Sequence, residues 1–111
     1  VAIIQEQIEA IQDEMAVAVN ERIRAITSNT PEATTNAIEA MGANPAIRKY
    51  MDNKEKEFGR VLELEDFRTD KRLREWVKSK IIEANQDEFK PIFASYETKI
   101  NVLKEVLNRP L

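Results

Sequence analysis

The residue types that most often perform chemistry are missing from this 111-residue chain or are rare in it. It has no histidine and no cysteine, which excludes a Ser-His-Asp triad, a histidine-ligated metal or haem, a thiolate zinc site and a cysteine nucleophile within the chain. The only glycines, Gly42 and Gly59, do not form a phosphate-binding loop. We therefore expect no self-contained enzyme active site, no metal and no cofactor, although a contribution to a composite site stays open.

Carboxylates are the remaining candidates for acid–base chemistry. They cluster at Glu63, Glu65 and Asp66 and again at Asp87 and Glu88. Both clusters flank predicted helix ends, where acidic side chains commonly complete the hydrogen bonds of the first turn. We interpret them as capping residues.

Basic residues are concentrated between positions 68 and 80. The six cationic side chains of this segment are Arg68, Lys71, Arg72, Arg74, Lys78 and Lys80. Lys71, Arg74 and Lys78 share one side of a predicted helix, as contacts to a phosphate backbone require, and Trp76 is close enough to stack on a base. The alternative is a solvated helix surface with Trp76 in the core. The spacing of Trp76 from Leu73 and the chain's net charge of -3 favour this alternative.

The composition predicts that helices position all of these side chains. The chain contains only 2 glycines and 4 prolines, whereas a strand-rich fold needs many turns that use these residues. Many of its commonest residues, such as Glu, Ala, Lys and Arg, are good helix formers. We expect an all-α single domain over residues 1–111, a bundle of about five helices with long first and last members.

The first helix is expected over residues 2–28. Its apolar stripe recurs every three or four residues, which is the period of one helix face. The stripe consists of Ile4, Ile8, Ile11, Met15, Val19, Ile23 and Ile26. A helix of this length extends about 40 Å. Its N-terminal part could contact another copy or another protein through Ile4, Ile8, Ile11 and Met15; the alternative is that the helix packs back on the long last one.

Capping residues and prolines predict where the other helices begin and end. Thr30 is expected to cap a second helix that Gly42 ends in a left-handed conformation, and Asn44-Pro45 opens the next one. Residues 45–52 and 54–66 are expected to be two helices or one bent helix. Thr69 is a candidate cap for the basic helix. The last helix either begins near residue 90 or is longer and is kinked at Pro91.

Residues 42–50, with their Asn-Pro-x-Ile helix start, resemble the beginning of some bacterial extracytoplasmic sensor domains. The same stretch is similar to the helical N-terminal parts of some phage DNA-packaging small subunits. The strand-rich sheet of such sensors is missing from this sequence. Asn-Pro is a general helix start, so the resemblance assigns neither family.

These patterns predict a non-catalytic helical module for protein interaction or oligomerisation. One alternative is a nucleic-acid-associated, possibly viral, helical protein that uses the basic residues of 68–80. Another is the extracytoplasmic helical part of a membrane sensor, which requires a membrane-spanning segment before Val1. No apolar run within the chain approaches the roughly 20 residues that a membrane-spanning helix needs.

The nucleic-acid alternative makes a specific prediction. Reversing the charges of Arg74 and Lys78 should abolish binding, and the affinity should fall steeply with salt, because phosphate contacts release counterions. Fluorescence anisotropy of a labelled duplex over a salt series would measure both effects. Binding that is indifferent to the two substitutions and to salt would remove this alternative.

Overall fold

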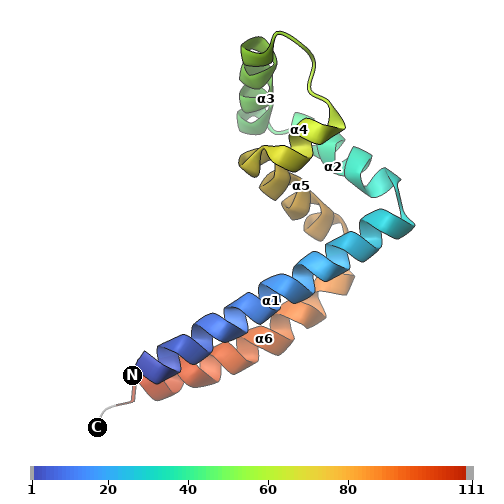
Figure 1. Cartoon of the computed structure of the whole chain (residues 1–111). Helices are drawn as coiled ribbons and strands as arrows, with labels where there is room; N and C mark the ends of the chain where they lie inside the picture. The colour runs from blue at the N-terminus through green and yellow to red at the C-terminus, as the bar shows by residue number, and fades with distance from the viewer. Residues whose placement is uncertain (1, 110–111) are drawn as a thin grey trace. The chain divides into compact units, whose positions relative to one another are not determined.

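The computed structural model describes residues 2–109, which form six helices and no strand (Figure 1). The helices are α1 (Ala2–Asn29), α2 (Glu32–Gly42), α3 (Pro45–Phe58), α4 (Leu64–Thr69), α5 (Lys71–Ala84) and α6 (Gln86–Leu107). The all-α class and the long first and last helices are therefore confirmed. The chain divides into two compact units: residues 2–25 with 85–109, and residues 26–84. That both belong to one domain stays a prediction.

The first unit is a pair of antiparallel helices, α1 and α6 (Figure 1). Near one end of the pair, Nη1 of Arg22 lies 3.6 Å from Oε1 of Glu88. Near the other end, residues 7–11 and 98–103 line the same groove. These two points establish the register in which the first helix packs on the last. The buried apolar side chains of the pair are Ile8, Ile23, Phe89 and Ile100.

Helix α6 begins before Pro91 and continues through it. Asn85 interrupts the helical path with φ -127° and ψ 40°, and its carbonyl accepts hydrogen bonds from the N–H groups of Glu88 and Phe89 at 3.0 and 3.3 Å. Pro91 lies near the start of the helix and removes one backbone donor there. The longer of the two predicted last helices is therefore the one that forms.

The second unit has a core to which each of its four helices contributes. The buried cluster consists of Met41, Ile47, Met51, Phe67 and Leu73. Met41 and Leu73 have no exposed surface at all. Helix α5 carries Leu73 and packs against α2 and α4, so the basic helix predicted from the sequence is also a central element of this core.

The predicted helix start at Asn44 is confirmed, whereas the predictions that Thr30 caps α2 and Thr69 caps α5 are wrong. Pro31 occupies the N-cap position of α2, and no side chain makes a capping hydrogen bond there. Oδ1 of Asn44 accepts hydrogen bonds from the N–H groups of Ala46 and Ile47 at 3.0 and 3.2 Å, as an N-cap should. Helix α2 does end at Gly42, but not in a left-handed conformation. Thr69 is the last residue of α4, and Asp70 caps α5 instead by accepting from the Leu73 N–H at 3.0 Å. A carboxylate at this position also complements the helix dipole.

The predicted helix over residues 54–66 does not form. Helix α3 continues to Phe58, and Gly59 ends it with φ 70°, a conformation that favours glycine. The chain then turns so that the Arg60 guanidinium contacts the Asp66 carboxylate in bidentate fashion, at 2.7 and 2.9 Å. The N–H of Glu63 also donates to Oδ2 of Asp66, at 2.7 Å. These bonds hold the loop that separates α3 from α4.

The fold predicts a large stability difference between two leucines of the second unit. Leu73→Ala should lower the free energy of unfolding by about 2–5 kcal/mol, because the side chain is fully buried and its removal leaves a cavity. Leu64→Ala is the matched control and should cost within about 0.5 kcal/mol, because Leu64 is 63% exposed. Urea unfolding followed by circular dichroism measures both; equal losses would contradict this description of the core.

The Arg60–Asp66 pair predicts a loss of stability in acid. The hydrogen bond from Arg60, followed by the one from the Glu63 N–H, lowers the pKa of Asp66 from 3.8 to about 2. This stabilisation is complete above pH 3.8 and is lost as the pH falls through about 2. Asp66→Asn should therefore be less stable than the unmodified chain at pH 5, and the difference should shrink towards pH 2. Denaturant unfolding at a series of pH values tests this, and a difference that stays constant would contradict it.

Candidate functional site

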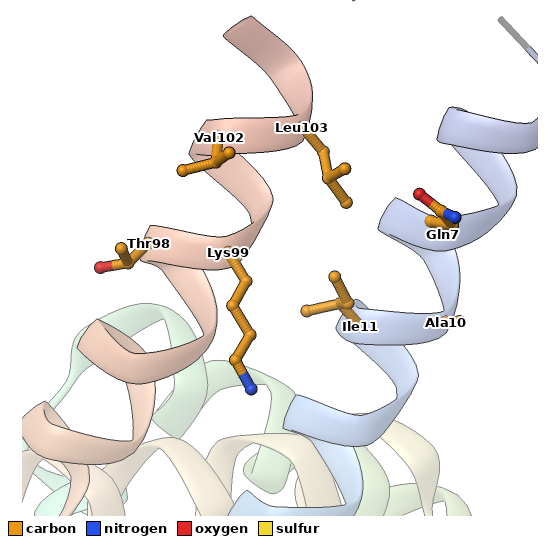
Figure 2. Close-up of a pocket in the computed structure, with 7 residues that line it drawn as sticks. All are labelled: Gln7, Ala10, Ile11, Thr98, Lys99, Val102 and Leu103. Atoms are coloured by element: carbon orange, nitrogen blue, oxygen red, sulfur yellow. The ribbon is translucent and has the colours of Figure 1, made fainter. Parts of the chain in front are cut away.

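An open apolar groove of about 540 Å³ lies between α1 and α6. Ala10 and Ile11 line it from α1, and Val102 and Leu103 line it from α6. Figure 2 shows Ile11 and Leu103 pointing towards each other across the space between the two helices. The remaining lining residues are Gln7, Thr98 and Lys99. The groove therefore combines an apolar floor with a few polar groups.

Within the described residues, four large hydrophobic side chains of this helix pair are exposed. They are Ile3, Val17, Val102 and Val106, which are 70%, 56%, 55% and 40% exposed, respectively. Val102 itself lines the groove, and Val106 follows it by four residues, one helical turn.

On α1 the exposed Ile3 and Val17 share one side of the helix with Ala10. They lie seven residues before and after Ala10, which lines the groove, and seven residues make about two helical turns. Each of these residues lies about 100° around the helix from the residue that follows it, so this stripe is separate from the main stripe of α1. Helix α1 therefore has exposed apolar side chains outside the stripe that packs on α6.

The four residues predicted to bind a partner lie mainly on the inner stripe. Ile8 is buried, while Ile4, Ile11 and Met15 are half-buried. Of the four, only Ile11 lines the groove. Their role in binding stays a prediction. The strongest periodicity of α1 indicates only the buried stripe; the seven-residue spacing of Ile3, Ala10 and Val17 is the sequence signal for the second, exposed one.

The six basic residues of 68–80 lie on or beside α5 and are mostly exposed. Four of them have acidic neighbours. The ion pairs are Arg68–Glu65 at 3.4 Å, Arg74–Glu75 at 4.0 Å, Lys78–Glu75 at 3.7 Å and Lys80–Glu83 at 3.2 Å. The acidic partners reduce the positive field that this surface presents. The remaining two, Lys71 and Arg72, are exposed, and the Arg72 guanidinium lies 5.5 Å from the centre of the Tyr50 ring.

Trp76 packs against the core of the second unit, in agreement with the interpretation of Trp76 as a core residue. Its ring meets that of Tyr50 edge to face, with the ring centres 5.1 Å apart and an interplanar angle of 84°. This geometry is favourable for aromatic pairs. The indole therefore serves intramolecular packing in this structure.

Tyr50 also belongs to a small polar cluster with Asp70 and Lys54. The Tyr50 hydroxyl donates to the Asp70 carboxylate at 2.9 Å, and Nζ of Lys54 lies 4.0 Å from the same carboxylate. Burial and then this hydrogen bond raise the pKa of Tyr50. Burial alone would raise the pKa of Asp70, but hydrogen bonds from the Leu73 N–H and from Tyr50 outweigh it and leave the pKa lowered. The cluster joins α3 to the start of α5.

Nowhere in residues 2–109 do three or more histidine, cysteine or acidic side chains gather as metal ligands would. None of the helices within this range is long and apolar enough to cross a membrane. The segment before Val1, where the sensor alternative requires an anchor, lies outside the described residues.

Comparison with known proteins does not assign this chain to a family. No protein family model, no curated protein and no solved structure matches the chain.

Proposed function

We propose that this chain is a non-catalytic helical module that associates with a second copy of itself through the groove face of the α1–α6 pair. The observation that carries the proposal is the open apolar groove between α1 and α6, which the exposed Val102 lines, together with the exposed Ile3, Val17 and Val106 on the same two helices. Scattered hydrophobic residues are normal on a protein surface. A contiguous apolar face with a few polar groups is typical of an interaction surface.

The geometry of paired helices supports self-association. In a four-helix bundle each helix packs against two neighbours and buries apolar side chains towards both. Here α1 has α6 as its neighbour on the inner stripe, and its second stripe, Ile3, Ala10 and Val17, faces outward. Packing two such pairs together would supply the second neighbour for each helix. Each square ångström of apolar surface removed from water would then contribute about 25 cal/mol.

The basic surface of 68–80 is the less supported location for function. Glu65, Glu75 and Glu83 lie beside four of its cations, and Trp76 is engaged with Tyr50. Phosphate binding would have to displace or compete with these ion pairs. In the described residues 2–109, Val102 in the groove lining is 55% exposed.

A single aspartate in the groove should abolish self-association. Val102→Asp places a charge in the apolar lining, and burying an unpaired charge costs several kcal/mol, so we expect a monomer. Val61→Asp is the matched control, because Val61 is a 74% exposed valine in the second unit. Light scattering over a concentration series would measure the molecular mass of both variants and of the unmodified chain.

We expect the unmodified chain and Val61→Asp to share the mass of a dimer or larger assembly, with Val102→Asp at 12.8 kDa. Circular dichroism should show unchanged helix content in both variants, because both valines are exposed. An unmodified chain that stays monomeric at every concentration, or a Val102→Asp variant that associates normally, would contradict the proposal.

A further inference from the structure

We propose that a hollow on the second unit binds a small organic cation with an apolar body, such as an arylalkylammonium ion. The hollow has a volume of about 450 Å³ and is lined by residues of α2, α3, α4 and the loop between α3 and α4. All of these lining residues belong to the unit formed by residues 26–84. The site is therefore separate from the groove of the α1–α6 pair and does not depend on self-association.

The floor of the hollow is apolar. It consists of Ile38, Met51, Leu62 and Phe67. Met51 and Phe67 are buried members of the core cluster, and Ile38 and Leu62 pack against that cluster. The packing that stabilises the unit therefore also holds the floor in place. Ligand sites typically have a volume of about 300–1,000 Å³, a mainly apolar lining and a few polar groups, and this hollow has all three properties.

The rim of the hollow is charged and mainly negative. The charged lining residues are Glu39, Arg48 and Glu55. Nε of Arg48 lies 3.4 Å from Oδ1 of Asp52, so the positive charge already has a partner. Among residues 2–109, Glu39 has no ion pair or side-chain hydrogen bond, and the Glu55 carboxylate accepts only from the Leu62 N–H, at 3.3 Å. Counting Asp52, three carboxylates and one guanidinium give this group a net charge of -2.

The other cations near this part of the sequence are paired elsewhere or lie outside the hollow. Nζ of Lys54 lies 3.3 Å from Glu57, and Nη1 of Arg60 lies 2.7 Å from Asp66. The exposed cations of α3 that do not line the hollow are Lys49 and Lys56. A bound cation would thus meet the two rim glutamates without displacing an ion pair of theirs. A concave surface lined by one sign of charge concentrates ions of the opposite sign.

Gly42 widens the hollow beside Arg48. It is the last residue of α2, and it does not have a positive φ, so its backbone conformation does not require glycine. A Cβ atom at this position would meet only Nη1 of Arg48, at 3.6 Å, which is an ordinary contact. The wall of the hollow can therefore be altered at Gly42 without straining the backbone.

Methyl NMR of the full chain with isotope-labelled methionine tests the site. The three methionines are Met15, Met41 and Met51, and of these Met51 lines the hollow. We expect phenethylammonium to shift the Met51 methyl resonance in a saturable way and to leave that of Met15, on α1, unchanged. Absence of a saturable Met51 shift would overturn the inference, whatever the oligomeric state of the chain.

Two further probes with the same ring separate charge from apolar contact: neutral phenethyl alcohol and the anion phenylpropanoate. We expect phenethylammonium to have the lowest dissociation constant and phenylpropanoate the highest, because the rim is negatively charged. Equal dissociation constants for the ammonium and the alcohol would show that the hollow does not select a cation. Tighter binding of phenylpropanoate would show that Arg48 recruits an anion instead. Either result overturns the inference.

Removing the two rim charges should weaken binding of the cation alone. The double variant Glu39→Gln with Glu55→Gln should raise the dissociation constant of phenethylammonium by about 2- to 25-fold, since each exposed charge pair contributes about 1.4- to 5-fold. That of phenethyl alcohol should not change. The matched control, Glu75→Gln with Glu83→Gln, removes the same net charge from α5, where neither residue lines the hollow. An equal effect of both double variants would overturn the assignment of the rim.

Filling the hollow provides a second, independent measurement. Gly42→Leu should abolish the Met51 shift, because the added side chain occupies space beside Arg48. Ala43→Leu is the matched control, since it adds the same side chain to an exposed neighbour outside the lining, and it should bind as the unmodified chain does. Circular dichroism should show the same helix content in both variants. Undiminished binding by a folded Gly42→Leu variant would overturn the location of the site.

Discussion

The structure depends most on how much of each long helix a single neighbour can cover. Helices α1 and α6 pair in antiparallel fashion and bury Ile8, Ile23, Phe89 and Ile100. One neighbouring helix covers only one side of an apolar arc. Helix α1 also has apolar residues outside the covered stripe: Ile3 and Val17 are exposed, and Ala10, on the same side, lines the groove. Exposed apolar side chains on an otherwise charged pair of helices are typical of a surface that contacts a partner.

The second unit covers the apolar side chains of its helices in a different way. Its helices are short, and four of them surround one buried cluster in which Met41 and Leu73 have no exposed surface. Asn44, Asp66 and Asp70 satisfy backbone donors at three successive helix starts. Arg60 and Tyr50 bind two of these carboxylates and so link the caps to neighbouring segments. Of the carboxylates considered for acid–base chemistry, Asp66 pairs with Arg60, Glu65 with Arg68 and Glu88 with Arg22.

The two surfaces considered for function differ in how far internal contacts satisfy them. On α5, Glu75 and Glu83 pair with basic residues of the same helix, and Trp76 packs on Tyr50. On the α1–α6 pair, an open apolar groove and exposed apolar side chains have no such partners among the contacts of the described residues. The helix pair is therefore the surface to which we assign the proposed function.

The sequence by itself determined the all-α class, the long first and last helices and the Asn44 cap, because apolar period and capping chemistry are local properties. It also showed that Trp76 belongs with Leu73 on a core face. Only the tertiary structure decided that Gly59 rather than Gly42 adopts the left-handed conformation, that α4 is separate from α3, and that Asp70 rather than Thr69 caps α5. It also decided which of two adjacent stripes on α1 is covered. The cap at Asp70 is a local bond to the Leu73 N–H, but the Tyr50 hydroxyl, twenty residues away, also binds this carboxylate. Which stripe of α1 is covered depends on its packing with α6, a contact between residues distant in sequence about which helical periodicity contains no information.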